Sequence, residues 1–558
     1  MVERMRRVLL LLCAGLVIPS AAYAAGPDRT GALLVTLAPG GAARPATATS
    51  AARAIAAAAR ARPSGFSVPQ IRLVTLRPLP GESLSALYRR LAADPRVRTV
   101  EYEHRAELRY VPNDPALTTP ETARDTAPGT TVQWWAARTG FPAAWDISRG
   151  IGATVAVIDT GAEIAHPELA GRVAASASFD AARTPAGIDL VGHGTHVASL
   201  ACAAGDNGVG MTGAGLGCRL LVVKSDFTDS SVAASIVWAV DNGADAINMS
   251  FGTAAGAQPS APVVRAIDYA VAHGVVLVSA AADDPVEDQG YPASALQPTG
   301  TAPDITQGKG LSVTAADFFD RRARFAGRGT QISLAAYGAY EEDDNDGPPG
   351  IFGAFTAAPN ALDTGSLGEG RPCRCRATFG GDQRYAYLQG TSMATPMVAA
   401  AAALVRHLNP DMGALEIVRV LKQTARRPAG TAWTPDLGWG ILDAGAALGV
   451  ARTLDRRPPV SKVRPAPRRT RQARVTLRWR GADVPRDGVA VSGLARYELW
   501  RSVDGRAARR ILATRRTSAR VRLRRGARYA FFTVAVDAAG NREPAPAVPD
   551  VRITVPRR

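Results

Sequence analysis

Short apolar runs alternate with helical segments between residues 140 and 450. The runs that are almost wholly apolar lie at 154–158, 219–223, 244–247 and 275–278. Strands that are buried on both faces appear in a sequence as continuous apolar runs, and helical connections between such strands are typical of parallel sheets. The pattern therefore predicts an α/β fold with three layers, in which a parallel sheet lies between helices.

Residues 25–112 predict a separate, smaller unit. Apolar runs at 32–37, 71–76 and 97–103 are separated by helical segments at 50–62 and 83–93. Ser83 is a favourable residue for the N-terminus of the second helix. We expect a small α+β domain that ends at the turn-rich segment 111–115, where an exposed boundary would lie.

The C-terminal part of the chain predicts a third kind of structure. Residues 451–474 are rich in proline and arginine and indicate a stiff linker. The segments at 475–479, 497–501, 519–523 and 531–536 then alternate apolar and polar residues. Such alternation with turns between the strands predicts an all-β sandwich over 475–558. It resembles a fibronectin type III module, chiefly through 529–541.

The first 24 residues predict an export signal. Arg4, Arg6 and Arg7 precede the apolar run 8–18, and Ala22-Tyr23-Ala24 is a small-x-small cleavage site. Because the apolar run is too short to span a bilayer, we expect removal after Ala24 and a secreted, extracellular protein. A signal that stays attached as an anchor is the alternative.

The net charge of +17 is unevenly distributed. Residues 451–558 contain 28 Lys and Arg against 8 Asp and Glu, a balance of +20, whereas residues 1–450 contain 38 against 41. Nucleic-acid binding is therefore not a property of the main body. The basic C-terminal region predicts binding to an anionic cell-wall polymer or membrane surface, and an arginine-rich solubilising surface is the alternative.

Four cysteines remain once the signal, which contains Cys13, is removed. Outside the cytosol they are expected to form disulfides. We expect Cys202 to pair with Cys218, because this bond closes a short loop. Cys373 and Cys375 would then pair with each other, with a thiolate metal site as the alternative.

Three motifs together carry the chemistry of an acyl-transfer enzyme. Asp159 ends an apolar strand, His193 stands in Gly-His-Gly-Thr-His, and Ser392 stands in Gly-Thr-Ser-Met-Ala-Thr-Pro before an alanine-rich helix. A serine nucleophile needs a base to take its proton and a carboxylate to orient that base. A helix N-terminus also offers N–H groups to a developing negative charge.

These motifs, in the order Asp, His, Ser, resemble those of the subtilisin-like serine peptidases (subtilases) over about residues 135–448. The resemblance implies a seven-stranded parallel sheet between helices in a peptidase domain, here 113–450. It implies endopeptidase activity on polypeptides, with Asp159 as orienting residue, His193 as general acid and base, and Ser392 as nucleophile. Residues 25–112 resemble the inhibitory propeptide, so the protein would be made as a zymogen that binds its own propeptide.

The same resemblance assigns a substrate cleft. It places Ser250, Phe251 and Gly252 on one wall of the main specificity pocket, and Ala280 and Ala282 on the opposite wall. An extended peptide would bind such a cleft as an added strand, which gives broad sequence tolerance.

The chain departs from the family at the oxyanion hole. Asp283 stands where the family usually has an asparagine side-chain donor, and the N–H of Ser392 would be the second donor. An ionised carboxylate repels an oxyanion, and loss of one donor in a subtilisin lowers turnover about 10²–10³-fold. A protonated Asp283 could donate instead. We therefore expect a slower or acid-favoured enzyme.

No cofactor is expected for the chemistry, but the resemblance implies structural calcium. Glu168 matches the position of a calcium-binding Asp in many subtilases, and Asn207 matches a calcium-loop asparagine. Oxygen ligands in a turn-rich loop suit Ca²⁺. A loop without a metal is the alternative.

Two other functions fit these features. One is a secreted binding protein on a peptidase scaffold whose activity is impaired by Asp283. The other is an enzyme that cleaves only its own propeptide and then serves in adhesion.

Overall fold

The computed structural model divides the chain into two compact units, Met1–Leu108 and Arg109–Arg558. The structure describes residues 29–38, 53–79, 82–104, 110–123, 126–340, 350–366, 371–428, 430, 432–484 and 489–557. The predicted signal, residues 1–24, lies outside the described residues. Among the described helices, none is both long and apolar enough to cross a membrane.

The first unit is a four-stranded antiparallel sheet with helix α2 (Leu84–Ala92). The strands follow the order β2-β3-β1-β4 and comprise β1 (Arg29–Leu37), β2 (Ala61–Val68), β3 (Leu73–Pro78) and β4 (Val97–His104), with a 3₁₀ turn at Pro69–Ile71. The hydroxyl of Ser83 accepts the N–H of Ala86, so the predicted cap is present. The helix predicted for 50–62 is present at 53–58 in the described residues and ends before Ala61, because residues from Ala61 onward form β2. Pro63 is tolerated there because β2 is an edge strand.

The α/β domain in the second unit contains seven parallel strands in the order β11-β10-β9-β8-β5-β7-β6. They are β5 (Thr154–Asp159), β6 (Val173–Phe179), β7 (Arg219–Ser225), β8 (Ala246–Met249), β9 (Val276–Ala280), β10 (Leu311–Ala316) and β11 (Leu334–Tyr337). The longer helices are α5 (His193–Cys202), α6 (Asp229–Asp241), α7 (Ala261–Ala272), α10 (Thr391–Leu408), α11 (Ala414–Thr424) and α12 (Ala444–Ala451). Short helices lie at Pro115–Leu117, α3 (Trp135–Arg138), α4 (Phe141–Ile147), α8 (Ala293–Leu296) and α9 (Ala361–Thr364).

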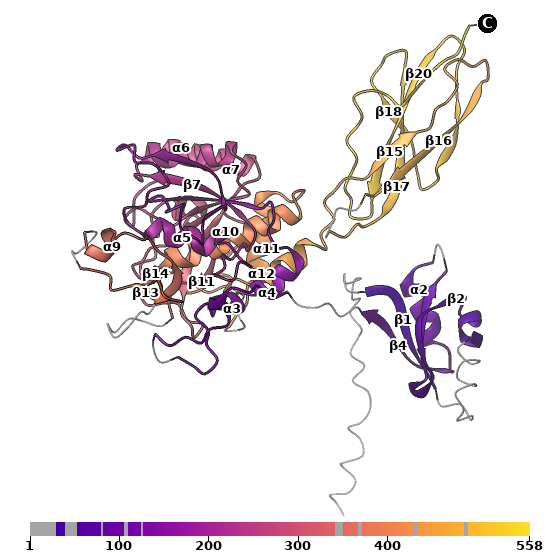
Figure 1. Ribbon diagram of the computed structural model, residues 1–558. Coiled ribbons are helices and arrows are strands. Elements are labelled where there is room, and N and C mark those ends of the chain that lie inside the picture. Colours follow the sequence, from indigo (N-terminus) through magenta and orange to yellow (C-terminus); the bar gives the residue numbers. More distant parts are fainter. Residues whose placement is uncertain are drawn as a thin grey trace, which may run out of the picture. The chain divides into compact units, whose positions relative to one another are not determined.

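Alternating residues of β5 show why helices cover both faces of this sheet. Val155 and Val157 are buried in the core that contains residues of α5 and α10. Ala156 and Ile158 point the other way, into the core that contains residues of α6 and α7. Figure 1 shows α6 and α7 above the sheet, with α5 and α10 on its other side. The predicted three-layer arrangement is confirmed.

A small antiparallel sheet follows β11 in the chain. It has the order β12-β14-β13 and comprises β12 (Ile351–Ala354), β13 (Arg376–Phe379) and β14 (Asp382–Leu388). The ring of the buried His196 in α5 contacts the carbonyl oxygens of Ile351 at 3.0 Å and Ala386 at 3.3 Å. Burial lowers the pKa of His196 to about 3, so this ring stays neutral and joins α5 to the small sheet.

The C-terminal module consists of two antiparallel sheets, β15-β16-β19 and β18-β17-β20-β21. Its strands are β15 (Val460–Val463), β16 (Arg474–Ala482), β17 (Leu494–Val503), β18 (Arg509–Thr514), β19 (Ser518–Arg522), β20 (Arg528–Asp537) and β21 (Val551–Thr554). Leu477, Trp479 and Phe531 are buried in its core. Because β15 lies inside the predicted linker 451–474, the all-β part begins earlier than residue 475.

Two disulfides join the four cysteines of the second unit. Cys202 is bonded to Cys218 with a Cα–Cα distance of 5.5 Å, and Cys373 is bonded to Cys375. Cys202 and Cys218 are fully buried between α5 and β7. Both pairings agree with the expectation from the sequence.

Removing the first disulfide should destabilise the α/β domain measurably. Cys202 and Cys218 are 16 residues apart in the sequence, so replacing both with serine removes a constraint on the unfolded chain. We expect the free energy of unfolding to fall by about 3 kcal/mol. Urea unfolding measures it. The matched control is the Cys373→Ser, Cys375→Ser variant, whose two-residue separation constrains the unfolded chain far less. Equal losses in the two variants would contradict the loop-length argument.

Candidate active site

Asp159 and His193 meet at the carboxyl end of β5. The Nδ1 atom of His193 is 2.8 Å from Oδ1 of Asp159, which also accepts the N–H of Thr160 at 2.8 Å. Asp159 is 1% exposed, whereas the His193 side chain keeps 26% of its surface open. A buried carboxylate on Nδ1 directs the other ring nitrogen, Nε2, toward the reacting group.

The close approach of α5 to β5 requires a glycine after the histidine. A Cβ atom on Gly194 would overlap the carbonyl oxygen of Gly161 and stand 3.0 Å from Oδ1 of Asp159. Any side chain there would push His193, the first residue of α5, away from Asp159. The glycine of the Gly-His-Gly motif therefore has a direct steric role.

Asp189 connects the segments that carry Asp159 and His193, and it was not singled out from the sequence. Its Oδ1 accepts the hydroxyl of Thr160 at 2.9 Å, and its Oδ2 accepts the N–H and hydroxyl of Thr195 at 2.8 and 2.7 Å. It is 7% exposed. A carboxylate four residues before His193, at the entrance of α5, is the signal that would have indicated this role.

The pKa of His193 is raised. Burial by itself lowers the pKa of this ring, but the negative charge and hydrogen bond of Asp159 outweigh burial, with smaller contributions from Asp189 and Asp283. A base with a raised pKa is protonated, and inactive as a base, up to a higher pH than an ordinary histidine.

Ser392 is the second residue of α10 and is 9% exposed. Gly390 precedes the helix with φ 151°, a value that favours glycine. Pro396 has no N–H for the Ser392 carbonyl four residues earlier. The hydroxyl of Ser250 donates to this carbonyl instead, at 2.9 Å. Ser250 therefore fixes the backbone that carries the nucleophile.

Among the described residues, no hydrogen bond joins Ser392 to His193. The Ser392 hydroxyl donates to the carbonyl of Ser250 at 3.1 Å. Catalytic hydrogen bonds are often formed only with substrate in the site, so this orientation is compatible with attack after rotation about the Cα–Cβ bond. The N–H of Ser392, in the first turn of α10, has no intrahelical acceptor and is available to an oxyanion.

The residues predicted for the substrate cleft lie at the ends of β8 and β9. Ser250 is 3% exposed and donates to the nucleophile segment, as described above. Phe251 packs against Phe227, with ring centroids 4.8 Å apart, and Gly252 is exposed. Ala280 is 3% exposed, and Ala282 is half-buried.

Asp283 contacts the residue that precedes the nucleophile. Its Oδ1 accepts the N–H of Thr391 at 2.7 Å and lies 2.9 Å from the Thr391 hydroxyl, whose one hydrogen is also within reach of the Ala281 carbonyl at 2.7 Å. The residue is exposed, but the protein atoms around its carboxyl group displace water and raise its pKa. The Thr391 hydrogen bonds and the charge of His193 lower the pKa without cancelling this effect.

Among the described residues, no hydrogen bond joins Glu168 to Asn207, the two residues predicted for calcium. Glu168 is fully buried, and its Oε1 accepts from the N–H of Met211 at 2.9 Å and the hydroxyl of Tyr385 at 2.7 Å. Its Oε2 is buried without a hydrogen-bond partner. The side-chain oxygen of Asn207 accepts the N–H of Val209 at 2.9 Å in its own loop. Glu168 thus has an oxygen without a hydrogen bond, whereas the Asn207 oxygen accepts one hydrogen bond and keeps its second lone pair.

Several known proteins are similar to this chain. Fervidolysin from Fervidobacterium pennivorans is 31% identical over 420 residues, which are 69% of this chain and 54% of that protein. Thermitase from Thermoactinomyces vulgaris is 29% identical over 328 residues, which are 58% of this chain and 94% of thermitase. The crystal structure of fervidolysin, a keratinolytic enzyme related to subtilisin, matches 96% of this chain and 74% of its own with 23% identity and a TM-score of 0.46.

The chain spans only about half the length of fervidolysin and 60% of the thermophilic serine proteinase of Bacillus sp. (strain AK1). The profile of the subtilase family matches residues 150–440, more than half of the 558 residues. The matched range contains Asp159, His193 and Ser392 together with the parallel sheet that positions the first two. The chain therefore belongs to the subtilase family.

Proposed function

We propose that this protein is a secreted serine endopeptidase that hydrolyses polypeptides through Asp159, His193 and Ser392. The observation that supports it best is the 2.8 Å contact between His193 and the buried Asp159. A histidine held by a carboxylate at the end of a central parallel strand is the arrangement that a serine nucleophile requires.

The reaction proceeds in two halves. His193 Nε2 takes the hydroxyl proton while Ser392 Oγ attacks the peptide carbonyl carbon, and the carbonyl oxygen becomes an oxyanion. His193 then gives this proton to the leaving amine as the C–N bond breaks, which leaves an acyl ester on Ser392. A water molecule repeats the sequence and releases the acid. Asp159 stabilises the charged imidazole throughout but takes no proton.

The oxyanion is stabilised by the N–H of Ser392 and by the protonated form of Asp283. Because Oδ1 of Asp283 accepts the N–H of Thr391, a proton on Oδ2 leaves that oxygen as the donor. The raised pKa of Asp283 increases the protonated fraction at a given pH. The enzyme is therefore slowed when Asp283 is ionised.

The polypeptide substrate lies extended between Ser250–Gly252 and Ala280–Ala282. Exposed backbone at Gly252 and the small side chains of the opposite wall favour strand-like pairing over recognition of one particular side chain. The first unit acts as the inhibitory propeptide, and cleavage near residues 110–120 releases the mature enzyme. Residues 1–24 direct export.

Labelling with a fluorophosphonate tests the proposal. We expect a stoichiometric adduct on Ser392 in the purified protein, together with turnover of an added peptide. A protein that is not labelled would be the binding protein on a peptidase scaffold. A protein that is labelled and loses its first unit, but does not cleave added peptides, would be limited to its own propeptide. N-terminal sequencing of the same sample identifies the site of maturation.

Glu168 predicts a dependence of stability on pH and on calcium. Burial raises the pKa of Glu168 to about 7, so the native state holds its proton over a range in which the unfolded chain has lost it. This stabilisation is complete below the unfolded pKa and is lost as the pH rises through about 7. The loss in the free energy of unfolding is about 3 kcal/mol. Glu168→Gln should abolish this pH dependence in urea unfolding.

Calcium would reverse this loss by binding the ionised Glu168. At about pH 8, calcium should then raise the unfolding midpoint of the parent protein but not of Glu168→Gln. Asn207→Ser is the matched control for the loop. If EDTA and calcium leave the parent midpoint unchanged, the calcium site is wrong.

A further inference from the structure

The outer face of the β15-β16-β19 sheet is a continuous cationic surface. Along β16, Val475, Leu477 and Trp479 are buried in the sandwich core, so the residues between them face solvent. Residues at paired positions of β15 and β19 share this face. We call it the basic face; its exposed cations are Lys462, Arg474, Arg478, Arg480, Arg520 and Arg522.

Like charges stand directly opposite each other on the basic face. Arg474 pairs with Arg522 across β16 and β19, and Lys462 pairs with Arg480 across β15 and β16. Directly opposed like charges destabilise an antiparallel sheet. The sheet therefore contains a repulsion that an anionic ligand would relieve.

Acidic residues of the module do not neutralise this face. Glu498 forms ion pairs with Arg510 and Arg542, which belong to the other half of the sandwich. The remaining described acids of the module accept hydrogen bonds from N–H or O–H groups; they are Asp455, Asp483, Asp504, Asp537, Glu543 and Asp550. Within the described residues, no carboxylate forms an ion pair with the basic face.

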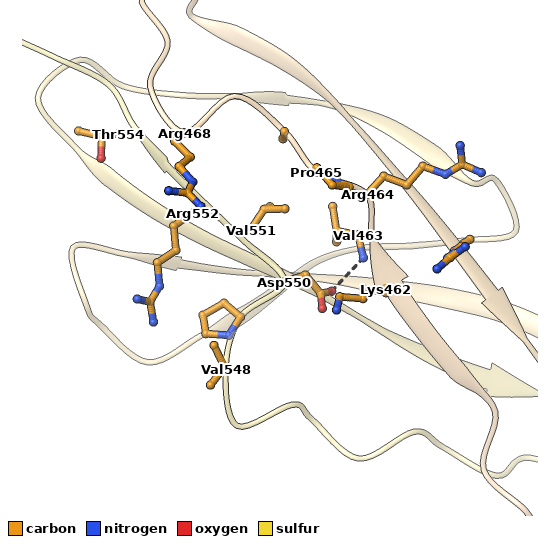
Figure 2. Close-up of a pocket in the computed structure, with 13 residues that line it drawn as sticks. Lys462, Val463, Arg464, Pro465, Arg468, Val548, Asp550, Val551, Arg552 and Thr554 are labelled. Carbon is orange, nitrogen blue, oxygen red and sulfur yellow. Dashed lines mark hydrogen bonds between the residues drawn. The ribbon is translucent and has the colours of Figure 1, made fainter.

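Two open grooves border the basic face. The larger, with a volume of about 1100 Å³, has Lys462, Arg464, Arg468, Arg480 and Arg552 along it. Figure 2 shows Asp550 in this groove with a hydrogen bond to Val463. Asp550 also accepts the N–H of Thr533 at 3.2 Å, so its charge is directed into the sheet. The second groove, of about 740 Å³, contains Arg474, Arg520, Arg522 and Arg524.

We propose that the basic face binds a linear polyanion with repeating phosphate groups. Residues two apart on a strand are separated by about 7 Å, so Arg474, Arg478 and Arg480 of β16 span about 20 Å. Thr476 stands between the first two, and Arg520 of β19 is paired with it. The guanidinium group binds phosphate through two parallel hydrogen bonds. A row of such groups between two grooves fits an extended chain of phosphates.

A membrane surface fits this face less well than a polymer. Trp479 is the only aromatic residue of the three strands, and it is buried. Val460 is the one large apolar side chain of these strands that is strongly exposed. Amphipathic elements that insert at a membrane interface bury an apolar face among the lipids. The basic face offers charge without such an anchor.

The test uses full-length Ser392→Ala protein, which cannot digest itself, and fluorescently labelled inorganic polyphosphate. Fluorescence anisotropy over a range of NaCl concentrations gives the affinity and its salt dependence. The face variant carries Arg478→Ser, Arg480→Ser and Arg520→Ser. The matched control carries Arg496→Ser, Arg509→Ser and Arg528→Ser, which remove the same charge from exposed positions of the other sheet.

We expect the face variant to bind polyphosphate at least about 10-fold more weakly, and its log–log salt slope to be smaller by about 2, for three lost phosphate contacts. The control should stay within about 2-fold of the parent. Equal losses in both variants, or a parent that binds vesicles containing phosphatidylglycerol but not polyphosphate, would overturn the proposal. Peptide hydrolysis by the same variants with Ser392 intact is a separate readout, so failure of the peptidase proposal leaves this test unaffected.

Discussion

Ser392→Ala should lower the turnover of peptide substrates about 10⁶-fold, the loss that the same change produces in a related subtilisin. Without Oγ there is no acyl ester, and His193 has no hydroxyl proton to accept. The variant should also accumulate as uncleaved precursor, because maturation by self-cleavage uses the same nucleophile. Initial rates with a fluorogenic peptide and the N-terminal sequence of the purified protein measure both effects.

The control for this experiment is Ser294→Ala, which removes another serine hydroxyl of the same domain. The Ser294 hydroxyl is buried and has no hydrogen-bond partner, so its loss should leave turnover unchanged. A Ser392→Ala protein that keeps a tenth of the parent activity, or that removes its own first unit, would refute the assignment of the nucleophile.

Asp283→Asn should increase turnover at neutral and alkaline pH by up to about 10²–10³-fold, the contribution of one oxyanion donor. Asparagine keeps the side-chain oxygen that accepts from Thr391 and places an NH₂ group where Oδ2 of Asp283 stands. The substitution therefore supplies a permanent donor without removing the hydrogen bonds that hold the loop.

The pH profile of this variant separates the two titrating groups. In the parent, activity requires neutral His193, which is lost as the pH falls below its raised pKa, and protonated Asp283, which is lost as the pH rises above its own. The parent should show a bell-shaped curve, whereas Asp283→Asn should lose the alkaline limb.

Asp284→Asn is the matched control, since it removes the same charge from the adjacent exposed residue. Its profile should keep both limbs. If kcat/KM of Asp283→Asn shows no gain at neutral pH, then the protein does not use residue 283 to stabilise the oxyanion.

Local sequence was sufficient for four strands of the central sheet, β5, β7, β8 and β9, and for the three motifs, but it did not indicate β6, β10 or β11. Apolar runs such as 154–158 are too short for helices and have the length of buried strands. Each run ends where the chain turns into a loop or helix. The end of such a strand indicates the place of Asp159. The start of a helix indicates the places of His193, which lies between two glycines, and of Ser392. These positions depend on residues that are adjacent in sequence.

Other elements depended on partners far away in the chain. The strand β2 contains Pro63 and lacks an apolar run, and it exists because β3 offers an unpaired edge. Likewise β15, which stands in a segment with the composition of a linker, is held by pairing with β16. Neither pairing has a local signal, because the hydrogen bonds that form it belong to another segment.

The sequence by itself determined the order of the domains, the layers of the α/β domain and the identity of the three residues proposed for catalysis, because apolar period and motif spacing are local properties. Only the tertiary structure decided how these residues are held. Asp189 connects the segments of Thr160 and α5, and Ser250 bonds a carbonyl 142 positions away that Pro396 leaves without a donor. It also decided that the arginines of β16 face others of their own charge, since strand register is set by contacts between strands.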